Sequence, residues 1–408
     1  MDYHIIAILG KAGDKDKLAS YSKDSDLKIS ELFNGEFINS THCLMESFGE
    51  SATYTFLGTS ESIKHHKDIF VNLSQCKAIF DKYPPIESSD IEDIFHQILE
   101  SIKSAHENNI ILDITHGFRH QPIIASFAST LGQINTKKSI TLLFAKEIER
   151  QEKYQYISLE KYSQISLIAL SLQTFVQTLS VPNMGLKEPF IIALSEFSKS
   201  LHANAFNEIF ANLDKAKSAL QNAKNSDSFK GLDNILSEVE FILSIFDDIK
   251  TTKENYNKYY KFARLMHTKR YYLISATYIY ESIALYIIEH LYNNNLITID
   301  NFTEYDLSNA VRYFVLTGKK PNDTKNGGNI FGDDVDNFKK ATKHKKNHQI
   351  EFDTWKQLIY DIKNLRNDLA HISKDTRHNI DIRENINKNL QALERIINNK
   401  STSIIKNL

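Results

Sequence analysis

The sequence is poor in cysteine, in net charge and in long apolar runs. Its two cysteines, Cys43 and Cys76, cannot build a disulfide framework and form no Cys-x-x-Cys pair. This scarcity suits a reducing cytoplasm and argues against structural zinc. Lys and Arg number 49 against 51 Asp and Glu, which gives a formal net charge of −2. A global basic field is therefore excluded, and any surface that binds nucleic acid must be local.

Targeting and membrane-spanning features are also missing. The first residues hold an apolar run of only a few positions with acids on both sides, which is unlike a signal peptide. No segment reaches the roughly 18 uninterrupted apolar residues expected of a transmembrane helix. We therefore expect a cytoplasmic protein without a membrane segment.

The chain does have the composition of a folded protein. Hydrophobic residues make up 41% and charged residues 25% of its 408 residues. These shares exclude a wholly disordered or collagen-like chain. At about 150 residues per domain, the length predicts two to three domains.

Short β-like runs alternate with helical stretches in the first part of the chain. The pattern predicts strands at residues 4–9, 53–57, 109–113, 139–145 and 154–159, and helices at residues 90–106 and 122–134. Asp90 is the expected N-cap of the first helix, and Pro122 lies in the first turn of the second. Residues 17–45 could hold a hairpin and a helix. The alternation predicts an α/β fold with a mostly parallel, Rossmann-like sheet.

Only helical patterns follow after about residue 163. They occupy residues 163–179, 188–211, 213–224, 232–250, 255–291 and 353–397, and the pattern at 255–291 holds either one long helix or two. Residues 271–291 are apolar or aromatic on nearly every face, which is typical of a helix buried in a bundle. We predict an α/β domain at residues 1–162, a helical linker at 163–250 and an all-α domain at 251–408. The Lys-rich segment 317–348 is either a solvated loop or a surface that attracts phosphates.

A sequence motif stands where the third predicted strand ends. Residues 111–122 read ILDITHGFRHQP. Ligands bind at the carboxyl ends of strands in such sheets, and the loops after residues 9 and 57 should share that edge. Small residues and hydrogen-bond donors in these loops predict a site for a phosphorylated or nucleotide-like ligand. The candidate binding residues are Gly10, Lys11, Gly58, Thr59, Ser60, Thr115, His116, Gly117 and Arg119.

Two other interpretations of this motif are open. In the first, Asp113 only caps the following helix, and the glycines only serve tight turns. In the second, His116 and His120 are four residues apart and Asp113 completes a facial triad for a metal. Pro122 disturbs the helical register and Arg119 would repel a cation, so we expect no metal.

The motif also resembles a known signature. Residues 113–119, DITHGFR, are similar to the DxTHG motif of CRISPR-associated proteins whose Rossmann-like domain, called CARF, senses cyclic oligoadenylates. The resemblance implies that this loop, with the loops after the first strands, lines a second-messenger pocket at the two-fold axis of a homodimer. We expect cyclic tetra-adenylate as the activator, because four adenylates match a two-fold site lined by short loops.

A second motif lies near the other end of the chain. Residues 365–372 read LRNDLAHI, so that four residues separate Arg366 from His371. This matches the R-x4-H signature of HEPN ribonucleases. Its context strengthens the match, because residues 269–287 resemble the long central helix of HEPN folds. The resemblance implies a helical HEPN domain and a composite site to which each chain of a dimer contributes.

The helical pattern around this motif places its members. After a predicted N-cap at Asp353, the apolar stripe consists of Trp355, Leu358, Ile359, Ile362, Leu365, Leu369 and Ile372. At about 100° per residue, His371 points away from the stripe and Arg366 lies at its edge, about 140° from His371. A single straight helix does not bring the two together, whereas a two-fold pair of helices could.

These residue types suit cleavage of RNA without a metal. The 2′-OH would attack the adjacent phosphate, His371 would move protons, and Arg366 would stabilise the charge that builds on the phosphorane. Asn367 could hold the histidine or a phosphate oxygen. The products would be a 2′,3′-cyclic phosphate and a 5′-OH.

The two motifs together resemble one architecture, that of type III CRISPR ancillary ribonucleases with an N-terminal CARF sensor and a C-terminal HEPN effector. We therefore expect a homodimer that binds cyclic oligoadenylate and cleaves single-stranded RNA. One alternative is a non-catalytic regulator that binds a partner protein or nucleic acid in response to a nucleotide. Another is that the CARF half also degrades its ligand, with Thr59, Ser60, Thr115 or His116 positioning the 2′-OH.

Overall fold

The computed structural model describes residues 3–11, 17–88, 90–118, 120–299, 302–319, 330, 331, 346–370 and 382–398, with backbone alone for 346–351. Internal contacts divide the chain into two units. The first comprises residues 1–175, 181–195 and 219–236, and the second comprises residues 176–180, 196–218 and 237–408. Each unit is described by itself below.

The first unit is built on a mixed sheet. Its described strands are β1 (Tyr3–Ile8), β2 (Ala19–Lys23), β3 (Gly35–Phe37), β4 (Ala52–Gly58), β5 (Ile86–Glu87), β6 (Asn109–Asp113), β7 (Ser139–Glu149) and β8 (Lys153–Ser158). They lie in the order β3-β2-β8-β7-β6-β1-β4-β5. Strands β7, β6, β1, β4 and β5 run parallel, whereas β8 pairs antiparallel with β7 and β3 pairs antiparallel with β2. The predicted α/β sheet is confirmed, and residues 17–45 hold a hairpin and a helix.

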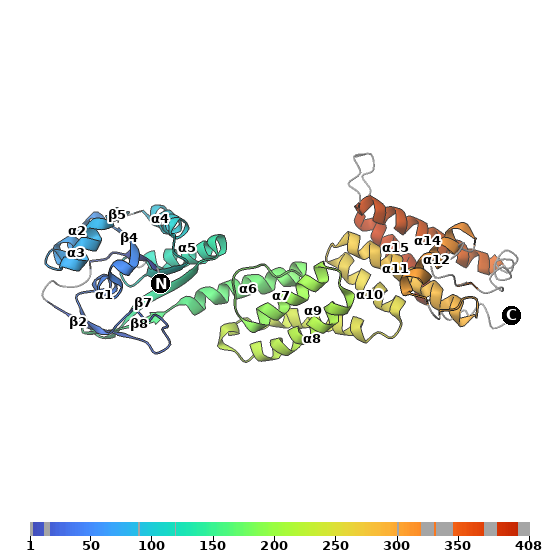
Figure 1. The fold of residues 1–408 in the computed structure, drawn as a ribbon, viewed down its shortest axis with the longest axis horizontal. Coiled ribbons are helices and arrows are strands. Elements are labelled where there is room, and N and C mark those ends of the chain that lie inside the picture. The colour runs from blue at the N-terminus through green and yellow to red at the C-terminus, as the bar shows by residue number, and fades with distance from the viewer. Residues whose placement is uncertain are drawn as a thin grey trace. The chain divides into compact units, whose positions relative to one another are not determined.

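Helices cover both faces of this sheet (Figure 1). They are α1 (Ser40–Phe48), α2 (Ser60–Phe70), α3 (Ser74–Lys82), α4 (Ile91–Ser104) and α5 (Gln121–Thr136). Side chains of β1 alternate between the faces, so that Ile5 and Ala7 pack with α1–α3 while Ile6 and Ile8 pack with α4 and α5. Burial on both faces explains the continuous apolar run of this strand. Asp90 caps α4 as predicted, with its side chain accepting from the Glu92 amide.

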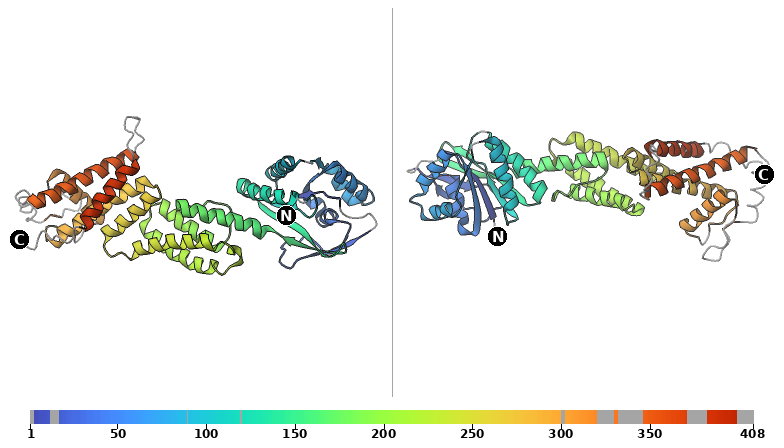
Figure 2. Two further views of the ribbon diagram at one scale, coloured as in Figure 1. Left: turned by 180° about the vertical axis from the view of Figure 1, so that it is seen from behind. Right: turned by 90° about the horizontal axis from the view of Figure 1, so that it is seen from above.

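The rest of the chain is helical, as predicted. The described helices are α6 (Glu160–Thr178), α7 (Pro189–His202), α8 (Phe206–Ala223), α9 (Asp233–Thr251), α10 (Asn255–Thr268), α11 (Tyr272–Asn293), α12 (Glu304–Thr317), α14 (Lys346–Ala370) and α15 (Ile382–Asn398). Figure 2 shows these helices from two further sides.

Two predicted helix boundaries are wrong. The helix predicted at 188–211 is two helices, because Asn204 adopts a left-handed φ of 55° that ends α7. Residues 255–291, expected to hold one helix or two, hold two, because a φ of 65° at Arg270 separates α10 from α11. Asp353 does not cap α14, which already begins at Lys346, because no Gly or Pro interrupts the segment before Asp353.

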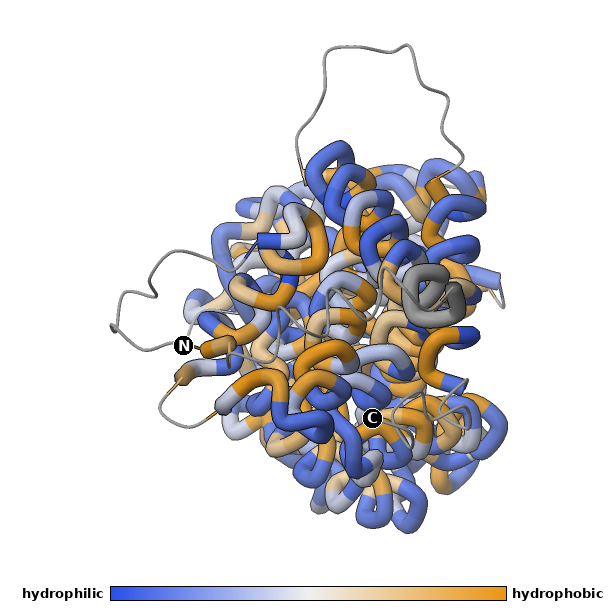
Figure 3. Tube along the Cα trace, turned by 90° about the vertical axis from the view of Figure 1, so that its right-hand side faces the viewer, coloured by the Kyte–Doolittle hydropathy of each residue, from blue (hydrophilic) through white to orange (hydrophobic). Residues whose placement is uncertain are grey.

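Helix α11 is the centre of the second unit. It contacts α10, α12, α14 and α15. Most of its side chains are buried, from Ser275 to Leu291. This confirms the prediction of a helix surrounded by a bundle. Hydrophobic and hydrophilic stretches alternate along the outer helices, as expected where one face of a helix is buried (Figure 3).

None of the helices in the described part of the chain combines the length and the apolar character of a membrane-spanning segment.

Candidate functional site

Three strand ends meet at one edge of the sheet of the first unit. Strand β1 lies between β6 and β4, and it is parallel to both, with Ala7 opposite Asp113 and Ile8 opposite Leu57. The loops that begin at Gly10, at Gly58 and after Asp113 are therefore neighbours. The structure thus brings the predicted binding loops together at the carboxyl ends of their strands.

The glycines allow the loops to touch. A Cβ atom on Gly10 would lie 2.7 Å from the backbone nitrogen of Gly117. Gly117 itself has a φ of 108°, and a Cβ there would meet the side chains of Gln121 and Ile8. No other residue fits either position without displacing its neighbour.

Asp113 anchors the turn of the DxTHG motif. It is fully buried, and its carboxylate accepts from the Thr115 amide at 3.0 Å, the Thr115 hydroxyl at 2.5 Å and the Ser40 hydroxyl at 2.8 Å. Burial raises the pKa of Asp113, and these hydrogen bonds act in the opposite direction. The hypothesis that Asp113 caps the next helix is wrong, because His120 occupies the N-cap position of α5.

Two imidazoles in this part of the first unit are neutral. The His116 Nε2 accepts from the Ser40 amide at 3.4 Å, so its proton is on Nδ1. His66 pairs its Nδ1 with the Ser62 carbonyl at 2.9 Å and is fully buried. Burial lowers the pKa of each histidine to about 4. Near neutral pH both rings are therefore uncharged hydrogen-bonding groups rather than cations.

The remaining predicted binding residues have different surroundings. Thr59 caps α2 by accepting from the Ser62 amide at 3.3 Å, and Ser60 is exposed. Lys11 forms an exposed ion pair with Glu61 at 2.5 Å. Arg119 lies outside the described residues.

Helix α1 also contributes to this site, which was not expected from the sequence. Its N-cap Asn39 accepts from the His42 amide at 2.9 Å, and Ser40 reaches both Asp113 and His116. Tyr156 of β8 donates to the Ser40 carbonyl at 3.2 Å. The letters NSTH at residues 39–42 do carry an N-cap signal, but no local pattern indicates that this helix start faces the motif turn.

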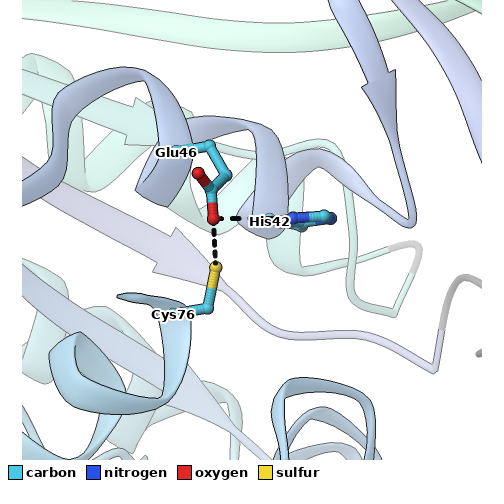
Figure 4. A group of neighbouring side chains, drawn as sticks. All are labelled: His42, Glu46 and Cys76. Atoms are coloured by element: carbon cyan, nitrogen blue, oxygen red, sulfur yellow. Dashed lines mark hydrogen bonds and ion pairs between the residues drawn. The ribbon is translucent and has the colours of Figure 1, made fainter. Parts of the chain in front are cut away.

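The residues with metal-ligand geometry are not Asp113, His116 and His120, the alternative metal set considered from the sequence. Within the described ranges, the cluster of this kind is His42, Glu46 and Cys76, whose ligand atoms lie within 4.8 Å of one another (Figure 4). The Ile38 amide donates to the His42 Nδ1 at 3.1 Å, so a neutral ring carries its proton on Nε2, facing Glu46. The Cys76 thiol donates to the same carboxylate at 3.4 Å.

These proton positions argue against a metal in the cluster. Burial raises the pKa of the Cys76 thiol, whereas a metal needs the thiolate. The His42 Nε2 has no free lone pair in the neutral tautomer that its neighbours impose. The three side chains are therefore better described as a buried hydrogen-bonded group.

The arginine of the second motif lies in the second unit, on α14. Arg366 is half-buried, and its guanidinium carbon is 4.8 Å from the centre of the Tyr280 ring on α11. The buried Arg312 of α12 contacts the same ring at 4.1 Å and forms an ion pair with Glu281. Among the described residues, no carboxylate forms a salt bridge with Arg366. This arginine is thus held by an aromatic face rather than by an acid.

The helical register predicted for α14 agrees with the structure. Trp355, Leu358, Ile359, Ile362 and Leu365 are buried. Arg366 is half-buried, as expected at the edge of the stripe, and Asn367 is half-buried as well. His371 and Ile372 lie outside the described residues, and so do residues 320–329 and 332–345 of the Lys-rich segment.

The outer face of α14 divides by charge. Lys356 and Lys363 are exposed on the side toward Arg366, and neither has a carboxylate partner within the described ranges. The other side borders a groove of about 800 Å³ between α14 and α15. Acids of α14 line this groove, namely Asp353, Asp361 and Asp368. A polyanion would be attracted to the first side and repelled by the second.

The chain was compared with known proteins. Residues 80–149, which include β6 and the motif turn, match the family model described as "CRISPR system endoribonuclease Csx1, CARF domain". This segment of the chain is thus similar to a CARF domain, and the resemblance seen in residues 113–119 is confirmed. A search of curated proteins found no match.

One solved structure similar to the chain is that of Enterococcus italicus Csm6 bound to cyclic hexa-2′-fluoro-hexa-dAMP. The sequence identity is 12%, the alignment covers 97% of this chain and 93% of that chain, and the TM-score is 0.42.

Proposed function

We propose, from the CARF match and the two sites, that the chain is a type III CRISPR effector that senses cyclic oligoadenylate and, when activated, cleaves single-stranded RNA. The main support for this proposal is the position of the motif turn, which lies within the matched segment and beside the ends of two neighbouring strands. The domain boundaries proposed with this function are residues 1–162 for the sensor, 163–250 for a helical linker and 251–408 for a HEPN-type effector.

In the sensor, uncharged groups would recognise the ligand. The loops at Gly10 and Gly117 approach each other closely enough for backbone amides to face a bound phosphate. His116, held neutral by burial, would offer hydrogen bonds to adenylate edges. We propose cyclic tetra-adenylate as the activator, bound across the two-fold axis of a homodimer.

In the effector, Arg366 would stabilise the phosphorane and His371 would move the protons. Asn367 would hold either the histidine or a phosphate oxygen. The attack of the 2′-OH breaks the P–O5′ bond and leaves a 2′,3′-cyclic phosphate, while the 5′ oxygen takes up a proton. No metal is needed for these steps. The lysine side of α14 supports a path for the RNA next to Arg366.

A complementation experiment tests the composite site. Arg366→Ala and His371→Ala chains should each be inactive, and their mixture should regain cleavage because one site of the mixed dimer keeps both groups. Denaturation and refolding of the mixture ensures subunit exchange. EDTA should leave wild-type cleavage unchanged. Chelator inhibition that Mg²⁺ reverses would contradict the metal-free mechanism, and absent rescue would place both groups of each site in one chain.

The geometry does not favour ligand degradation by the predicted sensor residues. The Thr115 hydroxyl donates to Asp113 and accepts from the Ala145 amide at 2.9 Å, so its hydrogen bonds belong to the turn. His116 has a pKa near 4, which makes it a weak base. A regulator without catalysis would show cyclic oligoadenylate binding but no RNA cleavage in the same assays.

A further inference from the structure

Three helices of the second unit converge on one aromatic ring. Tyr280 comes from α11, Arg312 from α12 and Arg366 from α14. The Tyr280 ring is 7% exposed, and the two guanidinium carbons lie 4.1 Å and 4.8 Å from its centre. These residues are far apart in the sequence, so only the tertiary fold brings them together.

The two arginines differ in how their charges are balanced. Arg312 is 6% exposed, and Glu281 neutralises it through an ion pair. Its Nη1 also donates to Asn309 at 3.4 Å, while its Nε has no described partner. Arg366 is half-buried, and its described contact with the Tyr280 face satisfies none of its N–H donors. The uncompensated positive charge of the cluster therefore belongs to Arg366.

This arrangement suits a cation that must be fixed in place but free to bind an anion. A carboxylate partner would hold Arg366 and also occupy its donors. An aromatic face attracts the guanidinium and leaves its N–H groups available. The Arg312–Glu281 pair packs against the same ring and limits the positions that the ring can adopt.

We propose that Tyr280 is a positioning residue for Arg366. In this proposal Arg312 holds the Tyr280 ring in place, and Glu281 neutralises Arg312 so that Arg366 is the one uncompensated cation among the described residues of the cluster. The proposal rests on the proposed ribonuclease function, because the anion that Arg366 awaits is an RNA phosphate. Loss of Glu281 alone would leave Arg312 as a second cation, which would repel Arg366 and compete for the same phosphate.

Substitutions at Tyr280 test the aromatic contact. Tyr280→Phe keeps the ring and should retain cleavage, whereas Tyr280→Leu should lower kcat about 10-fold to 100-fold with little change in KM. Tyr278→Leu is the matched control, because Tyr278 is buried on the same helix and contacts Phe262, Tyr259 and Phe206 instead. Equal losses in both leucine variants would show a packing effect and overturn the proposal.

Substitutions of the ion pair test the charge balance. Glu281→Gln should lower kcat, and the double variant Glu281→Gln/Arg312→Gln should recover part of the loss because the surplus cation is gone. If the substitutions acted only by destabilising the fold, the double variant would be less active than Glu281→Gln, because it removes more buried contacts. A double variant less active than Glu281→Gln would overturn this part of the proposal.

A measurement without RNA separates the proposal from the ribonuclease function. In the full-length protein labelled with ¹⁵N-arginine, the Nε–Hε resonance of Arg366 is identified as the one that Arg366→Lys removes. Its chemical shift should change in Tyr280→Leu, which removes the ring current, and should stay the same in Tyr280→Phe, which keeps it. A resonance unaffected by Tyr280→Leu would overturn the contact itself. If the Arg366 resonance shifts as expected but the wild-type protein cleaves no RNA, the contact between Arg366 and Tyr280 exists and the proposed function is wrong. The contact would then have no catalytic role.

Discussion

The two candidate sites hold their key residues in opposite ways. At the sheet edge, Asp113 and His116 are fixed by directional hydrogen bonds, and burial keeps the imidazole neutral. At the helical site, Arg366 keeps its charge and lies half-buried against the face of Tyr280. The difference matches the proposed ligands, since adenine edges need oriented neutral groups whereas a reacting phosphate needs a cation.

The contrast also predicts that the sites fail differently. Substitution in the neutral site should change ligand affinity or the stability of the turn, with basal cleavage little altered. Substitution in the cationic site should remove cleavage and leave ligand binding unchanged. Variants that alter both properties equally would weaken the comparison.

The largest expected effect is at the cationic site. Arg366→Ala and His371→Ala should each reduce cleavage by about 10³-fold or more, because the cation and the base act as a unit. Calorimetry with cyclic tetra-adenylate should give the wild-type dissociation constant for both variants. Loss of ligand binding in either variant would mean that the effect is not confined to the cationic site.

A smaller effect is expected at the motif turn. Gly117→Val should lower ligand affinity at least about 10-fold, because a side chain there meets Ile8 and Gln121 in a conformation that suits only glycine. Gly185→Val is the control, since Gly185 has a φ of 71° but a Cβ there meets nothing within 4 Å. Calorimetry on both variants measures the difference, and wild-type affinity in Gly117→Val would remove this turn from the ligand site.

Acid should destabilise the first unit through His66. Its pKa is about 4 in the folded protein and about 6.5 when unfolded, so the unfolded state binds more protons between these values. Stability is therefore present above pH 6.5 and falls as the pH drops toward 4, by about 3 kcal/mol for this fully buried ring. His66→Gln should remove that part of the pH dependence. Denaturant unfolding at pH 7 and pH 4.5 compares the two proteins, and parallel losses in both would contradict the assignment.

The smallest expected effect concerns the outer face of α14. Lys356→Ala/Lys363→Ala should raise KM for RNA a few-fold and lower the slope of log affinity against log salt by about 1 to 2. Lys388→Ala is the matched control, because Lys388 is exposed but paired with Glu384 at 2.8 Å. If Lys388→Ala lowers the slope of log affinity against log salt equally, the effect comes from the overall charge of the protein and not from an RNA path along the lysine side of α14.

The sequence predicts those features that local patterns encode. The apolar runs of the strands, the glycine turn at residues 113–117 and the stripe of α14 all correspond to the structure, because each depends on neighbours within a few residues. The role of Ser40 was not predicted, since its hydrogen bonds to Asp113 and His116 join residues more than 70 positions apart. Tyr280 and Arg312 were likewise missed, because cation–π contacts between helices have no sequence period.

Helix ends were the least predictable feature. Asn204 and Arg270 adopt left-handed conformations that end helices without a glycine, so the pattern continues through them. The acids that line the groove of α14 could be placed on one face by periodicity, but the partner helix α15 that forms the other wall could not.

The proposed function requires that ligand binding in the first unit activates cleavage at the R-x4-H motif. The most direct test is the cleavage rate of a labelled single-stranded RNA in EDTA, with cyclic tetra-adenylate, cyclic hexa-adenylate or no ligand, followed by end-group analysis. We expect strong acceleration by the tetra-adenylate ring, 2′,3′-cyclic phosphate ends, and no cleavage by His371→Ala. An unaccelerated rate with every ring, or equal activity in His371→Ala, would contradict it.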